Sequence, residues 1–117
     1  MSKIKIKVTL KNSQAESVHE LEGVIQDNAI KYFEKDNTKV IYNYKNHTLK
    51  RENNEIKMTI YFDKNLLRTT TKDLKETFDI EIKTTKIKNE NHNLEIEYEI
   101  SDGNETDTIC YRIEEIK

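Results

Sequence analysis

Proline and tryptophan are absent from this sequence of 117 residues, and glycine and cysteine are scarce. The two glycines, Gly23 and Gly103, lie too far apart to build the glycine-rich loop that holds phosphate groups. The single Cys110 cannot form an intramolecular disulfide, which is typical of a reducing compartment. Residues 1–11 alternate lysine with apolar side chains, unlike a signal peptide, and no later segment is apolar enough to span a membrane. We therefore expect a cytoplasmic protein with no membrane partner.

An excess of charge of one sign is also lacking, because 20 Lys and Arg residues stand against 22 Asp and Glu residues. This balance provides no basic field to attract nucleic acid, so we expect no nucleic-acid partner. Charged residues make up 36% of the chain, but the small net charge and the many Ile, Thr and Tyr residues favour a folded chain. The length is that of one domain, so we expect residues 1–117 to share one core.

Alternation of apolar and polar residues is the strongest pattern that is present. Ile4, Ile6, Val8 and Leu10 alternate with Lys and Thr, which predicts a strand with one buried face. Further strands are predicted in the segments 18–26, 29–34, 39–44, 47–51, 56–63, 78–88, 94–100 and 106–116. Gly23, inside one of these strands, indicates a bulge, a bend or a close approach of backbone. Polar turns separate about eight to ten strands.

Residues 64–77 fit two structures. Leu66, Leu67, Leu74 and Phe78 approximate the apolar stripe of a helix, and Thr71 with Asp73 could start a short helix. A hairpin of two short strands is the alternative, and both remain open at this point.

The last two predicted strands form a hairpin around the turn at Ser101 to Thr106, where Gly103 can adopt a positive φ. If the apolar residues of the two strands face each other, the register follows. The expected pairs are Tyr98 with Ile109, Ile96 with Tyr111, Leu94 with Ile113 and, on the outer face, Glu95 with Arg112.

A meander of this kind has two edge strands, and closing it into a barrel removes both edges. The absence of proline, which can block an open edge, also favours closure. We therefore predict an all-β fold, a single antiparallel meander β-barrel. Two open sheets packed face to face are the alternative.

The order of these segments resembles one family of proteins. The residues that carry the resemblance are the N-terminal Lys/Ile strand, Leu21-Glu22-Gly23, Tyr32-Phe33-Glu34, Met58 to Phe62, Ile82 with Thr84, Thr85 and Ile87, and Leu94 to Ile100. In this order the chain is similar to the YwiB-like family of uncharacterised bacterial proteins. The resemblance implies a lipocalin-like (calycin-like) barrel, and it implies no reaction and no catalytic residue. The segment 70–74 departs from the family in having neither proline nor glycine.

Residues that could carry catalysis or bind a metal are few. Cys110 has no histidine near it in sequence, and the spacing of His19, His47 and His92 is not that of metal ligands. The acidic loop 102–107 lacks the glycine and glutamate positions of a calcium loop. Glu95, Glu97 and Glu99 alternate with apolar residues and belong to the outer face. We expect no enzyme activity, no metal site and no cofactor.

Tyr98 and Tyr111 are predicted to point inward, where a buried hydroxyl needs a hydrogen-bond partner. Arg68 is a candidate for that partner. Two functions follow from two states of the interior. With an unfilled interior, the barrel binds a small apolar or amphipathic ligand, with Arg68, Tyr98 and Tyr111 as candidate ligand-binding residues. With a filled interior, it is a structural domain that binds a protein partner or forms a homodimer, through an exposed strand or a face that carries Tyr42, Tyr44 or Tyr61.

Overall fold

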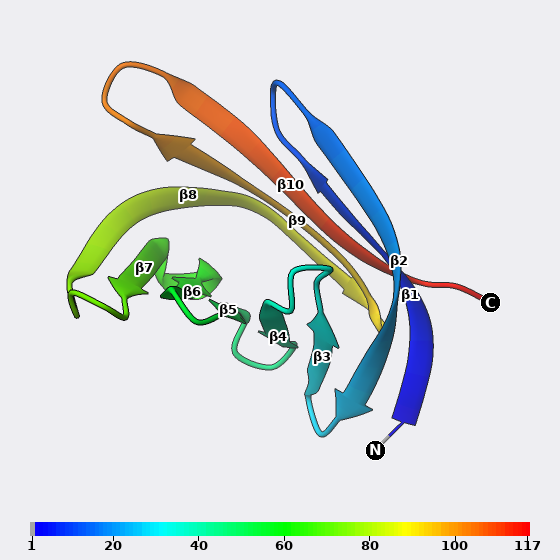
Figure 1. The fold of residues 1–117 in the computed structure, drawn as a ribbon. Coiled ribbons are helices and arrows are strands. Elements are labelled where there is room, and N and C mark those ends of the chain that lie inside the picture. The colour runs from blue at the N-terminus through cyan, green and yellow to red at the C-terminus, as the bar shows by residue number, and fades with distance from the viewer. Residues whose placement is uncertain (1) are drawn as a thin grey trace.

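Ten antiparallel strands close into a barrel in the computed structural model, which describes residues 2–117 (Figure 1). The strands are β1 (Ser2–Lys11), β2 (Glu16–Gln26), β3 (Ala29–Phe33), β4 (Lys39–Asn43), β5 (Thr48–Glu52), β6 (Ile56–Tyr61), β7 (Leu66–Thr71), β8 (Thr77–Glu90), β9 (Asn93–Ser101) and β10 (Thr106–Glu115). Each strand pairs with its neighbours in sequence, and β1 also pairs with β10. The predicted all-β meander barrel is confirmed, and the alternative of two open sheets is excluded.

The helical content of the described residues is small. A single turn of 3-10 helix, η1 (Phe62–Lys64), lies between β6 and β7. Within residues 2–117, no helix combines the length and the apolar character needed to cross a bilayer.

The alternating residues of the strands separate into an inner and an outer face. In β9, Leu94, Ile96 and Tyr98 are at most 9% exposed, whereas Glu95 and Glu97 between them are half-buried on the outside. Burial of one face in every strand supplies the dominant favourable free energy of folding, since each fully buried Ile, Leu or Val contributes roughly 1.5–3 kcal/mol. The core contains Ile6, Val8, Ile30, Tyr32, Val40, Tyr42, Leu49, Ile60, Phe62, Leu67, Ile82, Leu94, Ile96, Tyr98, Tyr111 and Ile113.

The hairpin of β9 and β10 has the register that the sequence predicted. All four expected pairs are present. The guanidinium of Arg112 lies 2.6 Å from the carboxylate of Glu95 on the outer face. Gly103 in the turn has a φ of 97°, as its predicted role requires.

Residues 64–77 form a hairpin, and the helical alternative was wrong. After η1, Asn65 adopts the left-handed conformation with a φ of 52°, which ends the helical turn and redirects the chain. Asn65 Oδ1 accepts a hydrogen bond of 2.8 Å from the backbone N–H of Thr84. The strand β7 then pairs with β6 on one side and with β8 on the other. Strand pairing on both sides outweighs the partial helical pattern.

Gly23 of β2 marks a close approach, one of the three roles that its position indicated. A Cβ atom at this position would lie 3.1 Å from Cδ1 of Ile30 and 3.2 Å from Cδ1 of Ile6. The missing side chain leaves room for these two core side chains to pack against the backbone of β2.

One end of the barrel is filled by aromatic side chains, and we call it the closed end; it carries the turns at 27–28, 44–47, 62–65 and 91–92. Here the Tyr42 hydroxyl lies 2.9 Å from Nδ1 of His47, and the Tyr44 hydroxyl donates to the carbonyl oxygen of His92 at 3.0 Å. Tyr42 is buried and Tyr44 half-buried. The exposed tyrosine face that we considered for self-association is therefore not formed by these two residues.

The opposite end, the open end, carries the turns at 12–15, 34–38, 53–55, 72–76 and 102–105. The hairpins β1–β2 and β9–β10 project past the short strands β3 to β7 at this end (Figure 1). The strand β2 pairs with β1 along its length but with β3 only over Val24–Gln26. The wall between β2 and β3 therefore lacks a hydrogen-bond ladder over residues 16–23.

Candidate functional site

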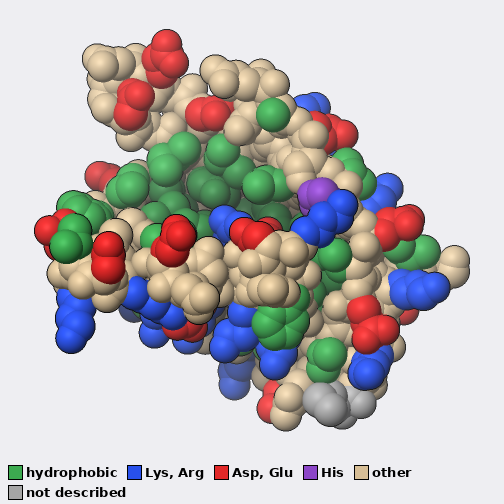
Figure 2. Space-filling view, viewed as in Figure 1, with side chains coloured by type: hydrophobic (Ala, Val, Ile, Leu, Met, Phe, Trp, Pro, Cys, Tyr) green, Lys and Arg blue, Asp and Glu red, His purple; other side chains and the backbone are tan. Residues whose placement is uncertain are grey.

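A cavity of about 300 Å³ occupies the interior near the open end and extends to the region where β2 and β3 separate. Six apolar side chains from β1, β4, β5 and β6 form much of its wall: Val8, Leu10, Val40, Leu49, Met58 and Ile60. Figure 2 shows hydrophobic side chains gathered in a hollow beneath the projecting hairpins, with charged side chains along its rim. The interior is thus not completely filled by the side chains of the protein.

Two tyrosine hydroxyls meet at the inner wall of the cavity. Tyr32 of β3 and Tyr111 of β10 are 2% and 5% exposed, and their phenolic oxygens are hydrogen-bonded to each other. Burial raises the pKa of both phenols, so both keep their protons at neutral pH. One hydroxyl hydrogen is used between the two oxygens. The other has no acceptor from the protein within residues 2–117.

Tyr98 of β9 adds a third hydroxyl to the cavity wall. Its ring packs against Phe62 at a centroid distance of 5.6 Å. Its hydroxyl forms no hydrogen bond within residues 2–117. Because no side-chain polar atom in this part of the chain is both fully buried and without a partner, this hydroxyl must be accessible. The Tyr98 hydroxyl therefore reaches the open space of the cavity.

A charged pair lies beside these tyrosines. Arg51 of β5 shares the inner face with Leu49, and its guanidinium is hydrogen-bonded to Glu34, which follows the end of β3. The two side chains are 34% and 32% exposed. Burial opposes the charge of Arg51, but the bond to Glu34 and the nearby Tyr32 and Tyr111 outweigh this effect, so the pKa of Arg51 lies above its ordinary value. A permanent cation therefore faces the cavity.

The three residues that the sequence predicted for ligand binding are only partly brought together. Tyr98 and Tyr111 both line the cavity. Arg68 lies on the outer face of β7, where its guanidinium donates to both carboxylate oxygens of Asp79 at 2.8 and 3.0 Å. The prediction that Arg68 partners a buried tyrosine was wrong, because the adjacent Leu67 takes the inward position.

The residues that sequence reasoning missed are Tyr32, Glu34 and Arg51. A signal for Arg51 was present: in a strand, a residue two positions after the apolar Leu49 shares its face. Tyr32 has the same relation to Ile30. The contact of Tyr32 with Tyr111 of β10 depends on closure of the barrel, which no local pattern describes.

The histidines do not converge. His19 lines the cavity, whereas His47 and His92 lie at the closed end. In the described part of the chain, His19 forms no hydrogen bond with Ser17 or Glu34.

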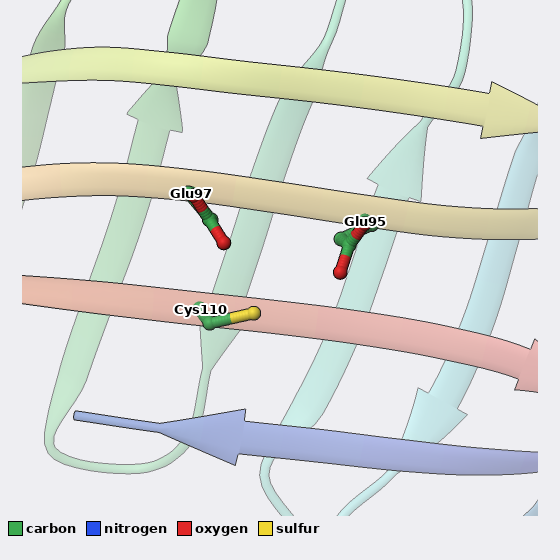
Figure 3. A group of neighbouring side chains, drawn as sticks. All are labelled: Glu95, Glu97 and Cys110. Carbon is green, nitrogen blue, oxygen red and sulfur yellow. The ribbon is translucent and has the colours of Figure 1, made fainter.

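Glu95, Glu97 and Cys110 form a separate cluster on the outer wall, with β9 and β10 supplying the three side chains (Figure 3). Glu95 is already paired with Lys86 at 2.8 Å and with Arg112 at 2.6 Å. Burial raises the pKa of the Cys110 thiol, which disfavours the thiolate that binds metals and attacks electrophiles. These contacts explain the cluster as part of the ion-paired outer face.

Comparisons with protein-family models, with curated proteins and with solved structures found no match for this chain.

Proposed function

We propose that this protein binds a small apolar or amphipathic molecule inside its barrel and is not an enzyme. The observation that carries this proposal is the cavity of about 300 Å³, which lies at the lower limit of ligand pockets, roughly 300–1,000 Å³. A cavity lined by apolar side chains with a few convergent polar groups is the usual form of a small-molecule site. From the order of its segments we also propose a relationship to the YwiB-like, lipocalin-like proteins, and we propose a cytoplasmic location.

The lining provides groups for binding more readily than groups for catalysis. The cation of Arg51 is paired, and the three tyrosine hydroxyls are protonated at neutral pH. Nucleophilic catalysis requires a base within hydrogen-bond reach of a nucleophile. Within residues 2–117, His19 and Ser17 form no such bond.

A substitution that places a bulky side chain in the cavity tests this proposal. Met58 lines the cavity, and the adjacent Lys57 lies on the outer face of β6. Met58→Trp should abolish the thermal stabilisation and the native-mass-spectrometry adducts given by medium-chain acids and alcohols. Lys57→Trp adds the same ring outside the barrel and should leave both unchanged. If no compound from the panel stabilises or co-purifies with the wild-type protein, the proposal is wrong.

A second candidate function, self-association through the open end, rests on a different observation. Four large apolar side chains, Leu10, Val18, Leu74 and Phe78, are 43–69% exposed, and all lie in or beside the parts of the strands nearest this end. The edge of β2 over residues 16–23 has no neighbour from β3. An exposed edge with an apolar side chain can pair with a second copy. Sedimentation of the protein at increasing concentration tests self-association. The wild type should form a dimer, and Val18→Lys should abolish that dimer. A wild type that is monomeric at every concentration would contradict this second candidate function.

A further inference from the structure

We propose that the molecule bound in the cavity is a medium-chain carboxylate, whose head group takes the place of Glu34 on Arg51. This inference rests on the proposed function and specifies its ligand. It follows from the number of hydrogen-bond donors in the cavity, the position of Glu34 and the volume available to the chain.

Several hydrogen-bond donors of the inner polar groups have no acceptor from the described residues. The guanidinium of Arg51 has five N–H donors, and its hydrogen bond to Glu34 uses one. The Tyr32–Tyr111 pair leaves one O–H without an acceptor from the described residues, and the Tyr98 hydroxyl leaves another. A ligand that offers only acceptor oxygens is complementary to such a group. A carboxylate does so with two oxygens, and it matches the planar fork of a guanidinium.

Glu34 shows that this position already accommodates a carboxylate. It follows the last residue of β3 and begins the turn 34–38, so its side chain reaches Arg51 from the rim of the cavity and is 32% exposed. A carboxylate that leaves Arg51 from this position can turn into water without becoming buried and unpaired. Exchange of Glu34 for a ligand carboxylate therefore keeps the charge of Arg51 balanced. A cationic ligand would instead place its charge beside that of Arg51.

The volume limits the length of the apolar chain. A water molecule occupies about 30 Å³ in the liquid, so a cavity of about 300 Å³ holds roughly ten non-hydrogen atoms. Octanoate has this size. Its chain would lie along the wall that includes Val40, Leu49 and Met58, with its head group beside Arg51 and Tyr98.

Calorimetric titrations with three probes of equal length, octanoate, 1-octanol and octylamine, test the inference on the full chain. The wild-type protein should bind octanoate more tightly than 1-octanol by about tenfold to hundredfold, the range expected of hydrogen bonds to a charged group. Arg51→Met should remove this preference and leave the affinity for 1-octanol within about twofold. Glu34→Gln should strengthen octanoate binding, because the competing carboxylate is gone.

Arg68→Met is the matched control, since Arg68 is also paired with a carboxylate but lies on the outer face. It should leave all three titrations unchanged. Tyr98→Phe provides a second test that does not depend on folding of the Arg51 variant. The Tyr98 hydroxyl has no partner within residues 2–117, so its loss should weaken octanoate binding while circular dichroism and the melting temperature stay unchanged.

The outcomes separate this inference from the proposed function. Equal affinities for octanoate and 1-octanol, both abolished by Met58→Trp, would overturn the carboxylate assignment and leave ligand binding intact. Tighter binding of octylamine would overturn it too, since Glu34 would then be the anchor. No binding of any probe, together with no hit in the wider panel, would overturn both.

Discussion

The phenolic oxygens of Tyr32 and Tyr111 are hydrogen-bonded to each other, although the two residues are 79 positions apart in the sequence. Tyr32 comes from the short strand β3 and Tyr111 from the long strand β10, and β1 and β2 lie between these two strands in the barrel. The bond joins two sections of the wall that no backbone ladder connects directly.

This bond predicts a coupled pair of substitutions. Tyr111→Phe should lower the free energy of unfolding by about 1–3 kcal/mol, because the buried Tyr32 hydroxyl then loses its partner. Tyr32→Phe should have a similar effect for the same reason. The double variant should lose less than the sum of the two, as expected of residues in contact. Urea unfolding of the four proteins measures the coupling, and strict additivity would contradict the bond.

The space in front of Gly23 predicts that a larger residue there overpacks the core. Gly23→Val should destabilise the protein by about 1–3 kcal/mol, because the new methyl groups meet the side chains of Ile6 and Ile30. Shortening Ile30 to Val in the same protein should recover part of the loss. Thermal unfolding of the single and double variants tests this. A Gly23→Val protein as stable as the wild type would show that the strands can move apart at this point.

The ion pairs of Glu95 predict a dependence of stability on acid. Hydrogen bonds from Lys86 and then Arg112 lower the pKa of Glu95 from 4.5 to about 2 in the folded protein. The folded state therefore favours the carboxylate, and this contribution is complete above pH 4.5 and disappears as the pH falls through about 2. Glu95→Gln should be less stable than the wild type at pH 7, and the difference should vanish near pH 2.

A control for the acid experiment lies two residues further along the same face. The carboxylate of Glu97 forms no ion pair within residues 2–117, so Glu97→Gln should show a smaller change between pH 7 and pH 2. Urea unfolding across this range measures both variants. A constant difference between wild type and Glu95→Gln at every pH would show that the ion pairs do not contribute.

The left-handed residue Asn65, just before β7, predicts a fourth stability effect. Asn65→Ala should cost about 2–4 kcal/mol, because an alanine at positive φ is strained by about 1–2 kcal/mol and the hydrogen bond to Thr84 is lost as well. Asn65→Gly avoids the strain but does not restore the hydrogen bond to Thr84. Its stability should therefore lie between that of Asn65→Ala and that of the wild type. Equal stability of all three proteins would contradict the observed turn.

The strands and the inward direction of Tyr98 and Tyr111 were predictable from the sequence, because a strand repeats every two residues and its pattern is local. The register of the last hairpin was predictable for the same reason, since a short turn relates Glu95 to Arg112. In residues 64–77, however, the local pattern fitted both a helix and a hairpin, and pairing of β7 with two neighbouring strands decided between them.

The contacts between the polar groups of the cavity were decided by tertiary structure alone. The sequence by itself determined a set of strands that each have one dry face, since alternation places apolar residues on the same side of a strand. It did not determine that Tyr111 meets Tyr32, that Arg51 meets Glu34, or that Arg68 lies outside. The contact of Tyr111 with Tyr32 joins strands distant in sequence, and it forms only once β1 has paired with β10 and the wall has closed around the interior.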